Sequence, residues 1–270
     1  MKLCVLIPTM NQTDFSKIYS MNIKCDVVIA NQCDKNEIKE KNINDNRVKL
    51  ISTNGRGLSN NRNIAFEHCY TDCELVLFAD EDLVFNDDYV DIILSEFKSH
   101  PEAQAINFNL YNISTSRKTS CPKILKWKKA TRKNISSFGV CGLVIKKNVL
   151  EYYNIRFNNY FGSGKENYCG EDTIFIQDLL KKKVKIYFSS KEIAGIDQTN
   201  SSWSEGYNEK YFMVTGRVFA TIYPRISKLL ALRSSIRFYK RKTTKMKFKD
   251  IFKSYLIGIN DIKKRKIYFK

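Results

Sequence analysis

The stretch Leu75-Val-Leu-Phe-Ala-Asp-Glu-Asp-Leu83 joins five apolar residues to three consecutive carboxylates. A short apolar run of this kind is typical of a buried parallel strand, and its abrupt end brings charge to the rim of a sheet. Open α/β sheets bind their ligands at that rim. Because Asp80 and Asp82 are separated by one residue, they favour a divalent cation with oxygen ligands, Mg²⁺ or Mn²⁺, whose other ligands come from water and substrate phosphates. The stretch therefore predicts an α/β fold with a metal or substrate site after this strand.

A structural alternative is that these acids only precede a helix. Residues 86–97 follow at once with a helical pattern, in which Asn86 would be the N-cap and the two acids after it would lie in the first turn. That interpretation explains the acids after Asn86 but gives no role to Asp80, Glu81 and Asp82. We therefore favour a metal or substrate role for these three residues.

The length and composition of the chain fit a globular α/β protein. Its 270 residues, 43% of them hydrophobic, can bury a sizeable core in one domain, alone or with a helical appendage. The sequence has no run of about 18 apolar residues, and its apolar N-terminus is too short for a signal peptide, so we expect a cytoplasmic protein without a membrane span. The eight cysteines are scattered without a Cys-x-x-Cys pair, which favours free thiols and argues against a zinc site.

The net charge of +18 is concentrated at the C-terminal end. From Arg225 onward there are sixteen Lys and Arg residues against two Asp residues, a local charge of +14, so residues 1–224 carry only +4. The basic character belongs to the tail, and the main domain is close to neutral. The overall charge is therefore no reason to expect nucleic-acid binding.

Alternating short strands and helices predict a parallel sheet with right-handed crossovers in the first half of the chain. The expected strands there are residues 3–7, 26–30, 48–52 and 75–79, with helices at residues 14–21 and 58–69. Further strands are expected at residues 105–111, 138–145 and 184–188, with a helix at residues 173–183. Three more helices are expected at residues 211–222, 226–239 and 248–259. We expect a main α/β domain over residues 1–224 and a basic helical tail over residues 225–270.

A turn around Gly55-x-Gly57 precedes the second of these helices. A dinucleotide-binding loop begins in a similar way, but Asn60 stands where its third glycine would be. The alternative is a glycine-rich turn with Ser59 as the N-cap. In either case, backbone amides and Arg62 at a helix N-terminus predict an anion site.

Two further acids, Glu171 and Asp172, open a helix after a loop with three glycines at residues 160–170. In isolation they would be a charged first turn that complements the helix dipole. Their position directly after a flexible loop makes them candidates for a functional site.

The last expected helix carries one apolar stripe at three- and four-residue spacing, from Phe248 to Ile259, with lysines beside it. Such a helix either packs on the main domain or lies on an anionic membrane surface. The sequence leaves both alternatives open.

Together these stretches resemble the family 2 glycosyltransferases of GT-A fold, particularly bacterial members that build surface polysaccharides. The matching segments are Val5-Leu-Ile-Pro-Thr9, Val27-Val-Ile-Ala-Asn31, Gly57-Leu-Ser-Asn-Asn-Arg-Asn-Ile-Ala65, Phe78-Ala-Asp-Glu-Asp82 and the region from Phe161 to Thr173 with its Cys-Gly-Glu-Asp sequence. Each segment is a weak signal alone, but their order and spacing are specific and cover roughly residues 3 to 215. The resemblance implies a mostly parallel, Rossmann-like sheet with flanking helices and a C-terminal basic helical tail.

The resemblance also implies a role for each matching position. The implied nucleotide-sugar site comprises Pro8, Thr9, Asn31, Gly57, Arg62, Asp80 and Glu81. Asp82 is the implied direct ligand of a divalent cation, Mn²⁺ or Mg²⁺, with Asp80 nearer the ribose or a metal-bound water. Asp172 is the implied general base, with Glu171 beside it.

The sequence departs from the family pattern in two places. The second strand usually ends in Asp, whereas Asn31 stands there, so contact with the base would come from the backbone or from Asn31. Some relatives have a metal-binding His late in the domain, but no His follows His100, and Asp197 or water would substitute.

The activity implied by the resemblance is inverting transfer of a sugar from a nucleotide-sugar, with UDP favoured, to a saccharide or lipid-linked saccharide. Such acceptors are assembled at the inner face of the membrane, which the basic tail would reach. One alternative is a nucleotidyltransferase, but residues 8–12 lack the glycine-rich, basic loop that such an enzyme normally has after its first strand. A non-enzymatic nucleic-acid-binding protein would explain the tail alone, so we expect no nucleic-acid partner.

Overall fold

The computed structural model describes residues 1–113, 123–132, 134–135, 137–197 and 206–265. By internal contacts the chain divides into two compact units. Unit 1 comprises Met1–Asn159 and Phe175–Asn200, and unit 2 comprises Tyr160–Ile174 and Ser201–Lys270. The boundary expected at residue 225 is not where these units divide, because helix α6 (Glu209–Ile222) packs with the later helices.

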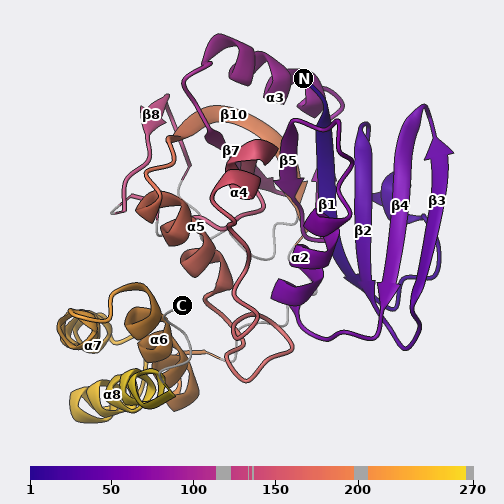
Figure 1. Ribbon diagram of the computed structural model, residues 1–270. Coiled ribbons are helices and arrows are strands. Elements are labelled where there is room, and N and C mark those ends of the chain that lie inside the picture. The colour runs from indigo at the N-terminus through magenta and orange to yellow at the C-terminus, as the bar shows by residue number, and fades with distance from the viewer. Residues whose placement is uncertain (114–122, 133, 136, 198–205, 266–270) are drawn as a thin grey trace. The chain divides into compact units, whose positions relative to one another are not determined.

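Unit 1 is built on one mixed sheet whose described strands follow the order β3-β4-β2-β1-β5-β9-β7-β10-β6, with β8 paired to β10. The strands are β1 (Leu3–Met10), β2 (Asp26–Gln32), β3 (Glu37–Ile43), β4 (Asn46–Thr53), β5 (Leu75–Phe78), β6 (Leu83–Phe85), β7 (Ala105–Asn112), β8 (Lys128–Lys129), β9 (Leu143–Lys146) and β10 (Ile186–Ile196). Strands β4, β2, β1 and β5 are parallel neighbours, as expected from the sequence. Figure 1 shows β1, β2, β4 and β3 side by side.

The helices of the described residues are α1 (Lys17–Ser20), α2 (Leu58–Glu67), α3 (Tyr89–Ser99), α4 (Lys147–Tyr152), α5 (Glu171–Lys181), α6, α7 (Ser227–Lys240) and α8 (Phe248–Arg265). None of them combines the length and the hydropathy needed to cross a lipid bilayer. Residues 266–270, the end of the expected basic tail, lie outside the described residues.

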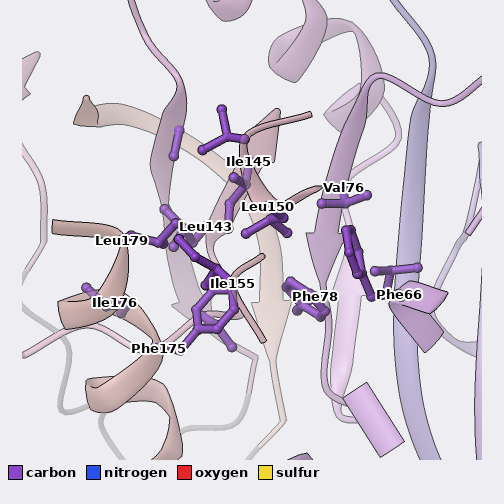
Figure 2. Packing of buried hydrophobic residues seen from close by; sticks show 14 of the residues in the cluster. Phe66, Val76, Phe78, Leu143, Ile145, Leu150, Ile155, Phe175, Ile176 and Leu179 are labelled. Carbon is purple, nitrogen blue, oxygen red and sulfur yellow. The ribbon is translucent and has the colours of Figure 1, made fainter. Parts of the chain in front are cut away.

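Strand β5 is buried on both faces, which explains its unbroken apolar run. Leu75 and Leu77 face one hydrophobic cluster, while Val76 and Phe78 face another on the opposite side of the sheet. Figure 2 shows the second cluster, where Phe78 lies near Phe175 of α5. Burial of each such side chain contributes roughly 1.5–3 kcal/mol. This packing fixes the end of β5, and with it the position of the acids that follow.

Two helix starts differ from the sequence-based prediction. Helix α3 begins after Asp88, and Asn86 is not its N-cap, because the Asn86 amide instead donates to the carbonyl of Glu192 at 3.0 Å. Helix α2 begins at Leu58 with Gly57 in the cap position, and Ser59 lies buried inside the helix. Gly57 has a φ of 108°, a backbone conformation that only glycine adopts readily.

Unit 2 contains helices α6, α7 and α8, and the apolar stripe predicted on the last helix packs inside this unit. Ile251, Tyr255 and Ile259 are fully buried in a cluster that includes Phe212 of α6. Of the two alternatives for this stripe, packing against protein is therefore correct, and the partner is α6. The contact is close: a Cβ built at Gly258 would lie 1.9 Å from the carbonyl oxygen of Met213.

Candidate functional site

The start of α2 connects the ends of three strands at one edge of the sheet. The side chain of Asn61 donates to the carbonyls of Thr9 at 2.9 Å and Ala30 at 2.8 Å, which joins α2 to the ends of β1 and β2. The side chain of Asn63 donates to the carbonyl of Phe157 and accepts from its amide. Arg62, between them, is 1% exposed and points to the end of β5. The carboxyl edge of the sheet is thus organised around one turn of helix.

Arg62, which is buried, and Asp80, whose side chain is 40% exposed, form an ion pair at this edge. Nη2 of Arg62 donates to Oδ1 of Asp80 at 2.7 Å, and its guanidinium lies 5.1 Å from the ring centroid of Phe157. Burial alone would raise the pKa of Asp80, but the charge and the hydrogen bond of Arg62 outweigh it and lower the pKa below its ordinary value. Cys141 donates a further hydrogen bond in the same direction. Asp80 is therefore ionised at neutral pH.

The pKa of Asp82 is shifted in the opposite direction from that of Asp80. Burial, followed by the negative charge of Asp80, raises the pKa of Asp82 to about 6. Glu81 and Asp197 add smaller increases, and the backbone amide of Asp197 donates to the carbonyl of Asp82 at 3.0 Å. Oδ1 of Asp82 is buried and has no hydrogen-bond partner among the described residues. Among the described residues, no basic side chain pairs with this carboxylate.

These observations fit a divalent cation bound by a small number of protein ligands. An unpartnered carboxylate oxygen beside other acids provides the hard oxygen donors that Mg²⁺ and Mn²⁺ prefer. Within the described residues the acids of this edge do not converge into a group of three ligand atoms, as they would in a closed all-protein site. An ion here would keep open positions for water or for the oxygens of a bound phosphate.

Thr9 and Asn31, at the ends of β1 and β2, lie next to each other in register and are both buried. The amide of Asn31 donates to the carbonyl of Gln12 at 2.8 Å and to Oγ of Ser52 at 3.0 Å. Its Oδ1 accepts from the backbone amide of Gln12 at 2.7 Å. These bonds hold the loop after β1. Asn31, which stands where the family usually has Asp, therefore has a structural role.

The other residues expected at the nucleotide site lie along the same edge. Pro8 is buried in β1. The amide of Gly57 donates to Oε1 of Gln32, at the end of β2, at 2.9 Å. Glu81 is exposed and pairs with Lys17 at 3.3 Å. Nucleotide recognition by these residues remains a prediction, although the topology brings all of them to the carboxyl ends of parallel strands.

Glu171 and Asp172 belong to unit 2, where they form the first turn of α5 and are half-buried. The loop before them is held by Arg217 of α6, a buried residue that no sequence motif singled out. Its guanidinium donates to Glu166 and to Asn167, each at 2.7 Å, and to Asp261 of α8 at 2.8 Å. Arg217 therefore fixes the loop that presents the two acids.

Comparison with known protein families supports the resemblance to glycosyltransferases. Residues 22–153 match the family model described as "Glycosyl transferase family 2", which confirms the resemblance to that family. No curated protein sequence matches the chain.

Solved structures of S. aureus TarS share the fold. TarS 1–349 in complex with UDP-GlcNAc superposes with a TM-score of 0.67 at 15% identity, over 97% of this chain and 80% of that one. TarS 1–349 in complex with UDP gives a TM-score of 0.61 at 14% identity, over 100% and 93% of the two chains. Against a longer TarS structure the chain spans only 44% of that protein's length, at 16% identity and a TM-score of 0.61. At these identities the likeness shows the GT-A fold.

Proposed function

We propose that this protein transfers a sugar from a nucleotide-sugar, a UDP-sugar in the first instance, to a saccharide or lipid-linked saccharide of a surface polysaccharide. The observation that carries the proposal is the carboxyl-edge arrangement of Arg62, Asp80 and Asp82, in which the buried Oδ1 of Asp82 has no partner within the described part of the chain. Support comes from the family model over residues 22–153. TarS, which has the same fold, was solved with UDP-GlcNAc and with UDP.

In this proposal Asp82 is the direct ligand of a divalent cation, and Asp80, held by Arg62, lies beside it. When bound, the cation neutralises the negative charge that develops on the departing diphosphate. Arg62 keeps Asp80 ionised and oriented. Pro8, Thr9, Asn31, Gly57 and Glu81 shape the edge against which the nucleotide binds.

Asp172 would accept the proton of the acceptor hydroxyl, so that the oxygen attacks in line and the anomeric carbon inverts. Glu171 adds a like charge beside it, and Arg217 orients the loop that carries both acids. Arg217 is in this sense a positioning residue.

A second feature favours docking of the protein on an anionic lipid surface. Helix α7 buries its small residues, Ala231 and Ser235 among them, and exposes large apolar ones. Leu229, at 64% exposure, leads an outward stripe at helical spacing that continues through Leu232, Ile236 and Tyr239. From Arg225 to Lys249 the chain has ten Lys and Arg residues and no acidic one. This combination of an apolar stripe and positive charge is typical of helices that lie in the membrane interface.

The direct test of activity is release of nucleoside diphosphate from a panel of nucleotide-sugars, measured with and without a divalent cation. The proposal predicts turnover of at least one donor, seen as nucleoside diphosphate and free or transferred sugar. Release of pyrophosphate from a nucleoside triphosphate and a sugar phosphate would instead identify a nucleotidyltransferase. Absence of both reactions across the panel would contradict the proposal.

A further inference from the structure

Three cysteines that are scattered in the sequence meet at the edge of the sheet opposite the carboxyl-edge site. Cys4 lies near the start of β1, Cys69 follows α2, and Cys73 precedes β5. All three are buried, and their Sγ atoms lie within 4.8 Å of one another. No disulfide joins these residues or any others that the structure describes.

The surroundings of this three-thiol cluster supply an oxygen donor and a positive charge. Sγ of Cys73 lies 3.7 Å from Oδ2 of Asp26, the residue beside Cys4 in the β1–β2 register, and this oxygen also accepts from Nε of Arg47 at 3.1 Å. The positive charge of Lys147 acts on Cys69, and a cavity of about 240 Å³ is lined by both Cys73 and Lys147. The cluster is therefore buried, and one of its members, Cys73, also lines a cavity.

We propose that Cys4, Cys69 and Cys73 bind one thiophilic metal ion, Zn²⁺, with the Asp26 carboxylate as the nearest fourth donor. Sulfur atoms around a tetrahedral Zn²⁺ lie about 3.8 Å apart, because each Zn–S bond is about 2.3 Å long. The three Sγ atoms, all within 4.8 Å of one another, are within about 1 Å of that spacing. Three sulfur donors select Zn²⁺ over the hard cations suited to the carboxylates of Asp80 and Asp82.

When Zn²⁺ binds, the thiols release their protons to water and the Zn–S bonds replace the S–H bonds. The bound ion would connect the start of β1, the end of α2 and the start of β5.

Cobalt titration of reduced, chelator-treated full-length protein tests this site, because Co²⁺ replaces Zn²⁺ and reports on sulfur ligands. We expect a near-ultraviolet thiolate-to-cobalt absorption band that saturates at one ion per chain and disappears when Zn²⁺ is added. The protein purified with reductant should also contain about one zinc per chain by elemental analysis, and added Zn²⁺ should raise its Tm.

Variants separate this site from the carboxyl-edge site. Cys73→Ser and Cys69→Ser should lose the band and the Zn²⁺-dependent rise in Tm, whereas Cys33→Ser, outside the cluster, and Asp82→Asn should keep both. Circular dichroism tests whether each variant is folded. If one variant does not fold, the band of the wild type still tests the proposal. Absence of the band in the wild type, its persistence in both cluster variants, or a disulfide between two of the three cysteines in protein purified with reductant would overturn the proposal.

Discussion

Asp82 is held in a state that is unfavourable without a cation. Because its pKa is about 6 in the folded protein and about 3.9 in an unfolded chain, the folded state binds the proton more tightly. The stability that this proton confers is present below about pH 4 and is lost as the pH rises through about 6.

Asp82→Asn should therefore stabilise the metal-free protein at neutral pH, where the carboxylate is ionised and its buried Oδ1 has no partner among the described residues. We expect a gain on the order of 1 kcal/mol, allowing for solvent screening of this partly exposed group, and no gain at pH 4. Thermal unfolding in chelator at both pH values measures it, with the exposed Asp88→Asn as control. A loss of stability at neutral pH would show that Asp82 has a favourable partner in the protein.

Asp172→Asn distinguishes a catalytic residue from a charged first turn. Asn preserves size and hydrogen bonding at the start of α5, so a purely structural role predicts a change of about 1 kcal/mol or less and normal turnover. A general base predicts a fall in kcat of roughly 10²-fold to 10⁴-fold with nucleotide affinity nearly unchanged.

The matched control for this change is Asp178→Asn in the same helix, where the carboxylate pairs with Lys181 at 2.9 Å. Equal turnover in the two variants would assign Asp172 to the structural role.

At the scale of single elements, the packing of α6 on α8 depends on glycine. A methyl group at Gly258 would overlap the backbone of Met213, which cannot move aside as a side chain can. Gly258→Ala should therefore lower the free energy of unfolding by about 3 kcal/mol, despite the higher helix propensity of Ala. Urea unfolding measures the cost. Asn260→Ala, at an exposed position of α8, is the control and should be within about 0.5 kcal/mol of wild type. Equal stability of the two variants would contradict the packing described for α8.

The elements that could be predicted from the sequence are those whose own burial dictates their pattern of apolar and polar residues. Strand β5 and its terminal acids were predictable, because burial on both faces demands an unbroken apolar run. The edge strand β3 was not, since its sequence, Glu-Ile-Lys-Glu-Lys-Asn-Ile, is mostly charged and largely exposed. The stripe on α8 predicted a buried face but could not identify α6 as its partner.

The same distinction holds for the candidate site. Asp80, Asp82 and Arg62 were recognisable from their positions after a strand and at a helix start. The roles of Asn61 and Arg217, and the meeting of Cys4, Cys69 and Cys73, depend on residues far apart in sequence. Only the three-dimensional path of the chain brings those groups together.

For the molecule as a whole, the exposed stripe on α7 predicts binding to anionic vesicles. Each basic residue near the surface contributes about 1 kcal/mol at most, an attraction that salt weakens. Leu229→Ser with Ile236→Ser should reduce co-sedimentation with anionic vesicles several-fold, and raising the salt concentration should reduce it further. Ile257→Ser, a partly exposed position on α8, serves as the control. Equal binding to neutral and anionic vesicles, or none to either, would contradict the docking proposal.

The central claim is that the carboxyl edge of the sheet binds a nucleoside diphosphate through a divalent cation held by Asp82. Calorimetric titration of UDP into the wild type and Asp82→Asn, with Mn²⁺ and with chelator, tests it most directly. We predict that Mn²⁺ tightens UDP binding to the wild type by at least about tenfold, equivalent to about 1.4 kcal/mol, and has little effect on the variant. Equal affinity of the wild type for UDP with and without the cation would contradict the claim, as would an unchanged response to Mn²⁺ in Asp82→Asn.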